Sequence, residues 1–203
     1  MTVTPDLRER RRLATQAEIE EVALDLFARH GSDRTTVDDI ASAAGVSPRT
    51  FFRYFATKED AALGASRAFD AAVAARVEAL VGRGAALRDF EDVIAEVLAE
   101  MAAAPGSIDR MLRVRCLVMD DAGLRSALLR LDAEQSRAFF RRIATATGSP
   151  TVDLRTRVIA ETLGAGLRAA LDDWAWRREA GEDADVVAIY RQTCAALREV
   201  AAG

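Results

Sequence analysis

Apolar residues recur along most of the chain at intervals of three and four positions, which is the spacing of one face of an α-helix. Between residues 15 and 30 they fall at Ile19, Val22, Ala23, Leu26 and Phe27. Related patterns follow at residues 35–55, 58–81, 90–104, 108–119, 124–147, 152–178 and 184–202. No segment alternates in the manner of a half-buried strand. We therefore expect an all-α protein with about nine helices.

Two short helical patterns within residues 35–58 are separated by a tight turn. Thr36 is suited to cap the first helix, because its hydroxyl can accept a hydrogen bond from a free backbone amide. Gly45 is suited to end that helix, since glycine adopts the left-handed backbone found at helix C-termini. Ser47 and Pro48 then supply the cap and the first position of the second helix. The stretch has the form of a helix-turn-helix.

The preceding helix completes a three-helix unit, so we predict a helix-turn-helix DNA-binding domain over residues 1–60. Residues 61–203 are then expected to form a second helical domain. The helix over residues 58–81 is long enough to link the two. The arginines at positions 8 and 10–12 form either a basic arm on DNA or the solvated start of the first helix.

Charge is distributed unevenly, because the chain of 203 residues carries a net charge of −4 but Ser47–Lys58 holds three cations and no carboxylate. Such a local reversal favours DNA reading, since phosphate contacts supply much of the affinity. The acidic total counts against a protein that binds DNA without sequence preference. The candidate DNA-contacting residues are Thr36, Ser47, Pro48, Arg49, Phe52, Arg53, Tyr54 and Lys58.

The position of a side chain relative to the second helix suggests its role. The N-terminal end of a recognition helix enters the major groove, so Arg49 is the best candidate to contact a guanine edge. The alternative for Arg49 is an ordinary surface cation. Tyr54 and Lys58 are expected to contact phosphates, and Phe52 to pack or to contact a thymine methyl group.

The remaining composition argues against several other functions. The chain has one histidine and two separated cysteines, with no nucleophile–base set, phosphate loop or metal-ligand spacing, so we expect no enzyme activity, no cofactor and no metal. No apolar run reaches the roughly 18 residues of a membrane span, and no signal peptide is evident. We expect a cytoplasmic protein.

Residues 15–63 resemble the N-terminal domain of the TetR-type (tetracycline-repressor-like) transcriptional regulators. The matching positions are Ala23, Leu26, Phe27, Gly31, Thr36, Val37, Ile40, Ala41, Ala44–Ser47, Thr50–Phe52, Tyr54, Phe55, Lys58, Glu59 and Leu63. The family often has tyrosine where this chain has Phe52. The resemblance implies a homodimeric, ligand-responsive repressor of a palindromic double-stranded operator. It also implies that residues 61–203 form a helical effector-binding and dimerisation domain, in which helices near 152–178 and 184–202 pair with a second copy.

The C-terminal part offers candidates for an apolar effector pocket and for the dimer interface. The pocket candidates are Met101, Met111, Cys116, Met119, Phe139, Phe140 and Trp174, for which the alternative is ordinary core. Arg113, Arg115 and Asp120 are charged neighbours that can anchor a polar group, although nothing in the sequence selects them. The interface candidates are Leu163, Leu167, Leu171, Tyr190 and Leu197. The stretch Ser47–Phe55 also resembles actinobacterial regulators, some of which answer to fatty-acyl thioesters.

Overall fold

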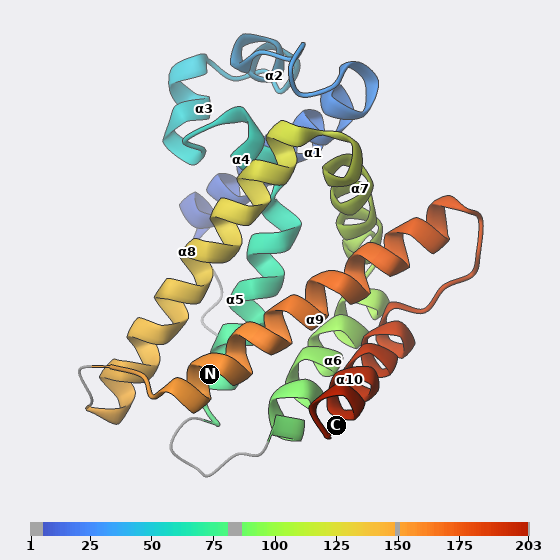
Figure 1. Ribbon diagram of the computed structural model, residues 1–203. Coiled ribbons are helices and arrows are strands. Elements are labelled where there is room, and N and C mark those ends of the chain that lie inside the picture. Colours follow the sequence, from blue (N-terminus) through green and yellow to red (C-terminus); the bar gives the residue numbers. More distant parts are fainter. Residues whose placement is uncertain (1–5, 81–86, 149–150, 203) are drawn as a thin grey trace. The chain divides into compact units, whose positions relative to one another are not determined.

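The computed structural model describes residues 6–80, 87–148 and 151–202, and all regular secondary structure in those ranges is α-helical (Figure 1). These described ranges contain ten helices. The expectation of an all-α fold is confirmed, with one helix more than the periodicity predicted. The extra helix arises because the segment that begins at Lys58 is divided at Leu63.

The chain forms two compact units. The first runs to Ala65 and also includes Leu117–Leu128, and the second comprises Ser66–Cys116 together with the residues that follow Leu128. The division at Ala65 lies close to the predicted boundary at residue 60. Leu117–Leu128 also belongs to the first unit although it begins more than fifty residues after Ala65, so a single boundary in the sequence cannot describe this division.

The helices of the first unit begin with α1 (Leu7–His30), which starts earlier than its apolar pattern predicts. Asp6 caps it, so the arginines at positions 8 and 10–12 lie on helix. The others are α2 (Val37–Ala43), α3 (Pro48–Tyr54) and α4 (Lys58–Ala62). The C-terminal end of α7 (Ser107–Asp120) and the first residues of α8 (Ala122–Thr147) also belong to this unit.

Local capping sets the bounds of α2. Thr36 and Asp39 form a reciprocal capping box at its start. At its end, Gly45 has φ +65°, and the Val46 amide donates to the Ala41 carbonyl at 2.9 Å. This is the Schellman arrangement, in which a left-handed residue lets the chain turn back on the last carbonyls. The turn therefore brings α3 against α2.

Aromatic and aliphatic side chains from α1, α2 and α3 form the core of the first unit. Ile19, Phe27, Ile40 and Phe51 are all buried, and the ring centroids of Phe51 and Phe55 lie 5.5 Å apart. Helices α2 and α3 have only seven residues each, so this packing rather than helix propensity must stabilise them.

The second unit contains most of α5 (Gly64–Glu78), the first part of α7, the remainder of α8, and three complete helices. Those three are α6 (Leu87–Ala103), α9 (Leu154–Glu179) and α10 (Val186–Ala202). Helix α10 packs against both α9 and α6 (Figure 1). A Cβ atom at Gly166 would lie 2.6 Å from Leu197 Cδ1, so glycine at this position permits the close approach of α9 and α10.

Candidate nucleic-acid interface and internal cavity

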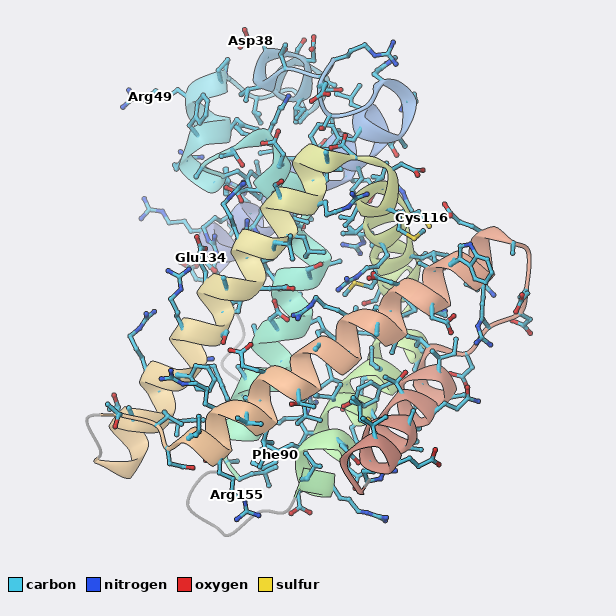
Figure 2. All side chains as sticks on the ribbon, viewed as in Figure 1. Asp38, Arg49, Phe90, Cys116, Glu134 and Arg155 are labelled. Atoms are coloured by element: carbon cyan, nitrogen blue, oxygen red, sulfur yellow. The ribbon has the colours of Figure 1, made fainter. Side chains whose placement is uncertain are left out.

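The N-terminal end of α3 presents a capped helix with an exposed cation. Ser47 Oγ accepts from the Thr50 amide at 3.1 Å, and Pro48 occupies the first turn, where no amide is needed. Arg49 is exposed, and Figure 2 shows its side chain projecting away from the helices of this unit. The predicted base-reading residues therefore share one accessible end of a helix.

Further along α3, an aromatic and cationic surface continues the same face. The Arg53 guanidinium lies 5.1 Å from the centre of the Tyr54 ring, and its Nη2 is 3.4 Å from the Tyr54 hydroxyl. Phe52 is 57% exposed while its ring meets the buried Phe51 edge to face at 5.6 Å. Phe52 thus offers an apolar surface to solvent rather than filling the core.

Thr36 has its hydroxyl fully engaged within the capping box. Its Oγ1 accepts from the Asp39 amide at 3.1 Å and donates to Asp39 Oδ2 at 2.7 Å. The hydrogen bonds that the Thr36 hydroxyl and the Thr36 amide donate to the Asp39 carboxylate lower the pKa of Asp39. The sequence predicts a phosphate contact for Thr36. Its hydroxyl can make that contact only while it also takes part in the hydrogen bonds with Asp39.

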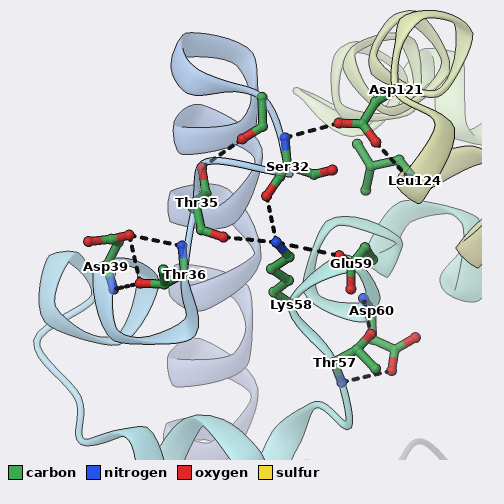
Figure 3. A network of polar contacts seen from close by, with 11 residues as sticks. Ser32, Thr35, Thr36, Asp39, Thr57, Lys58, Glu59, Asp60, Asp121 and Leu124 are labelled. Carbon is green, nitrogen blue, oxygen red and sulfur yellow. Dashed lines mark hydrogen bonds and ion pairs between the residues drawn. The ribbon is translucent and has the colours of Figure 1, made fainter.

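Lys58 lies among backbone carbonyls of the segment between α1 and α2 (Figure 3). Its Nζ donates to the Ser32 carbonyl at 2.6 Å and to the Thr35 carbonyl at 3.0 Å, and it is 3.8 Å from a carboxylate oxygen of Glu59. The sequence pattern predicted a phosphate contact for this ammonium group. In the structure its hydrogen bonds hold the segment that leads into α2.

Asp121 binds the same segment from the corner between α7 and α8. One carboxylate oxygen accepts from the Ser32 amide at 2.9 Å, and the other accepts from the Leu124 amide at 2.9 Å and so caps α8 (Figure 3). Burial alone raises the pKa of Asp121. The hydrogen bonds from Ser32, Leu124 and Gly123 outweigh burial and place that pKa below its ordinary value. No sequence pattern predicts this contact, because it joins residues 89 positions apart.

The second unit contains a partly open cavity of about 1470 Å³, lined by residues of helices α5, α6, α7, α8 and α9. Three of the seven predicted pocket residues line it, namely Met111, Phe139 and Phe140. Leu163 and Leu167, which were predicted at a dimer interface, line it as well.

The other four predicted pocket residues are not among the described residues that line this cavity. Met119 belongs to the first unit. The Trp174 indole is buried and donates to the Ala184 carbonyl at 3.1 Å, so it joins α9 to the segment before α10. Met101 and Cys116 lie on α6 and α7 without facing the cavity.

Five of the polar residues that line the cavity, which we call the polar cluster, lie on the four helices α5, α7, α8 and α9. They are Ser66, Asp70, Arg115, Asp132 and Arg168. Arg115 Nη1 lies 3.4 Å from Asp172 Oδ1, and Arg168 Nη1 lies 3.4 Å from Asp132 Oδ2. Of this cluster the sequence singled out only Arg115. A polar residue recurring on an apolar helical face is the one signal that points to the others.

Burial and the neighbouring Asp132 raise the pKa of Asp70 to about 7, although Arg115 and Arg67 act in the opposite direction. Burial also raises the pKa of Asp132 and lowers that of Arg115. The polar cluster is therefore a poorly solvated place in which the charged forms of Asp70, Asp132 and Arg115 are disfavoured.

The described residues contain no group of three or more His, Cys, Asp or Glu side chains placed to hold a metal ion. In the same ranges, no helix combines the length and apolar character that crossing a membrane requires.

Comparison with known proteins places both units in context. Residues 19–63 match the family model described as bacterial regulatory proteins of the tetR family. Over 190 residues the chain is 33% identical to the HTH-type transcriptional regulator TcmR of Streptomyces glaucescens, which covers 91% of this chain and 83% of that relative.

Two solved structures share the fold along most of the chain. One, from Syntrophomonas wolfei and assigned to the TetR-family transcriptional regulators, aligns with a TM-score of 0.60 at 18% identity, over 95% of this chain and 97% of that one. The other is FadR of Thermus thermophilus, a transcriptional repressor in complex with lauroyl-CoA, with a TM-score of 0.50 at 23% identity, over 91% and 93%. At these identities the likeness concerns the fold alone.

Proposed function

Because this chain is a member of the TetR family of bacterial transcriptional regulators, we propose that it is a homodimeric repressor that leaves a palindromic operator when a small, largely apolar effector occupies its cavity. The observation that carries the proposal is the exposed, cationic N-terminal end of α3. The family is not one of enzymes, and the polar side chains of this surface form no nucleophile–base set.

The DNA contacts proposed for α3 follow from which groups are accessible. Ser47, Pro48 and Arg49 lie at the end that enters the major groove, where an arginine can donate two hydrogen bonds to guanine. Arg53 and Tyr54 are held together one turn further along and suit a phosphate. Phe52 offers an apolar contact to a thymine methyl group.

Lys58 and Thr36 take a different place in this proposal. Both are engaged in hydrogen bonds that fix the start of α2. We propose that they orient α2, whose free amides face the phosphate backbone, and that Arg49 and Arg53 supply most of the direct cationic contact.

The proposed dimer face lies on α9. Exposed residues recur there at alternating steps of four and three, at Val158, Thr162, Ala165, Ala169, Asp172 and Trp176. This is the spacing of a seam along which two helices pack, and its alanines allow close approach. Leu163, Leu171 and Tyr190, which the sequence suggested, are buried in the protomer's own core, so the proposal uses the opposite face of α9.

Introducing a charge in this seam tests the dimer directly. Ala169→Arg should convert a dimer to a monomer in sedimentation velocity, because a buried unpaired guanidinium at a close helix–helix contact is costly. Ala99→Arg, on the exposed face of α6, is the matched control and should still sediment as a dimer. A dimer that persists in Ala169→Arg would remove α9 from the interface.

Coupling between effector and DNA is proposed to pass through the helices that have residues in both units, which are α5, α7 and α8. Helices α7 and α8 carry cavity residues and also reach the corner at Asp121, which holds Ser32. Half-sites lie about 34–36 Å apart, so a small change in the separation of two α3 helices disrupts one half-site. A differential affinity of about 1–3 kcal/mol is typical of such coupling.

Selection of bound duplexes from a random pool tests the proposed function. The expected product is a palindrome with half-sites about one helical turn apart, retained over random DNA by a large affinity ratio as salt rises. Recovery of sequences with no shared motif, or with a single unrepeated half-site, would refute a dimeric sequence-specific reader.

A further inference from the structure

The polar cluster contains two buried hydrogen-bonding atoms that have no partner among the described residues. Arg115 is 5% exposed and its Nε is unpaired, and Ser66 is 4% exposed and its Oγ is unpaired. Both residues line the cavity. Buried polar atoms are nearly always hydrogen-bonded, so unpaired atoms on two residues that line the same cavity point to a ligand group as their partner.

More of the cavity lining is apolar than polar. The lining includes Phe69, Val73, Ile94, Met111, Leu163 and Leu167. Drug-sized pockets measure roughly 300–1000 Å³, so a cavity of about 1470 Å³ has room for a body of several rings or a long chain. A ligand that fits both features is mostly hydrocarbon with an oxygen at one place.

Arg115 already interacts with three carboxyl groups, those of Asp172, Asp132 and Asp70. Asp132 and Asp70 line the cavity together with Arg115 and Arg168. An anionic ligand group at Arg115 would be repelled by the ionised carboxylates, in a place where burial already disfavours charge. An uncharged oxygen can accept from Arg115 Nε without that repulsion.

The raised pKa of Asp70 agrees with this preference for an uncharged ligand group. Burial and Asp132 raise its pKa to about 7, so the protein's own carboxylate is disfavoured at this place. In its protonated form the carboxyl can donate a hydrogen bond to a ligand oxygen. Ser66 and Asp70 are four residues apart on α5, so they share one helix face and can act on one ligand group.

Taking the cavity as the effector site of the proposed function, we infer that the effector is an uncharged, largely apolar molecule whose hydroxyl or carbonyl oxygen binds Arg115 Nε and Ser66 Oγ.

Arginines elsewhere along the cavity do not change this inference. Arg141 on α8 lies nine residues beyond Asp132, which is roughly 13 Å along a helix, and Arg155 on α9 lies still further from Arg168. Arg137, Arg141, Arg155 and Arg157 are all exposed, so water already solvates them. The Nε of Arg142, which also lines the cavity, is a third buried atom without a partner among the described residues. It lies ten residues beyond Asp132 on α8, roughly 15 Å along the helix, and so marks a place apart from the polar cluster.

Calorimetric titration of the full-length protein without DNA tests the inference. The probes are 2-naphthol and 2-naphthoate, which share an apolar body and differ in carrying a neutral hydroxyl or an anionic carboxylate at pH 7. We expect 2-naphthol to bind about tenfold tighter or more, since burying an anion beside carboxylates is far costlier than hydrogen-bonding a hydroxyl.

Variants assign the preference to the polar cluster. Ser66→Ala should weaken 2-naphthol binding by about three- to tenfold, as expected for one lost hydrogen bond. Asp70→Asn should strengthen 2-naphthoate binding and so reduce the difference in affinity between the two probes. Glu134→Gln, an exposed carboxylate of α8 outside the lining, is the control and should change neither probe (Figure 2).

Equal or tighter binding of 2-naphthoate, binding of neither probe up to its solubility limit, or variants that leave the difference unchanged would each overturn the inference. Because no DNA is present, these results are independent of operator selection. A failed operator selection beside the expected probe preference would refute the proposed repressor while leaving the ligand site standing.

Discussion

Replacement of Asp70 by asparagine should make the stability of the protein less dependent on pH. The pKa of this carboxyl is raised from 3.8 to about 7 in the folded state, chiefly by burial. Asparagine keeps the size and the hydrogen-bonding capacity of the side chain but has no charged form. The comparison of the two proteins therefore isolates the cost of ionising Asp70 within the polar cluster.

The sign of the effect follows from which state binds the proton. Between pH 3.8 and about 7 the folded protein holds this proton and the unfolded chain has lost it, so the free energy of unfolding falls as pH rises. Below that window Asp70 costs nothing, and above it the cost is constant. The rise of about three pKa units corresponds to at most about 4 kcal/mol, of which two units, or about 3 kcal/mol, fall between pH 5 and pH 7.

Urea unfolding at pH 5 and pH 8 measures this difference. Partial access of water reduces the figure, so we expect Asp70→Asn to gain about 1–3 kcal/mol relative to wild type between the two pH values. The surface variant Glu134→Gln should show the same pH dependence as wild type. A stability difference between Asp70→Asn and wild type that is equal at pH 5 and pH 8 would refute the assignment of a poorly solvated, charge-disfavouring cluster.

Two further predictions concern the first unit. Lys58→Met should lower the free energy of unfolding by about 2–3 kcal/mol, because it leaves the carbonyls of Ser32 and Thr35 without their charged donor. The control Arg29→Met should lower it by under about 0.5 kcal/mol. A Lys58→Met protein as stable as wild type would contradict the role of Lys58 in holding this segment. Gly45→Ala should cost about 1 kcal/mol in the same assay because of the positive φ, and Gly45→Asn less, so an equal cost for both would argue against a left-handed residue at this turn.

The features that sequence reasoning predicted well are those fixed by neighbours along the chain. The caps at Thr36 and Ser47 and the turn at Gly45 depend on hydrogen bonds that span only a few residues, so residue types at fixed spacing are sufficient to locate them. The same holds for the exposed position of Arg49 on a short helix whose opposite face carries Phe51.

The features that were missed depend on residues distant in sequence. Lys58 was expected to reach phosphate, but its acceptors lie 26 and 23 residues earlier, in a segment with no recognisable pattern. The polar cluster draws on α5, α7, α8 and α9, and no single helix reveals it. On α9 both faces are apolar enough to bury, so periodicity alone cannot tell the protomer's core from a surface left for a partner.

The contribution of Arg49 to operator binding tests the central claim most directly. A mobility-shift titration with a selected palindrome should show Arg49→Ala binding about 10- to 100-fold more weakly than wild type, as expected for the loss of a bidentate guanine contact. Arg29→Ala, an exposed cation of α1, should bind like wild type, and both variants should retain the wild-type oligomeric state. Operator affinity for Arg49→Ala within about twofold of wild type would contradict DNA reading by the N-terminal end of α3.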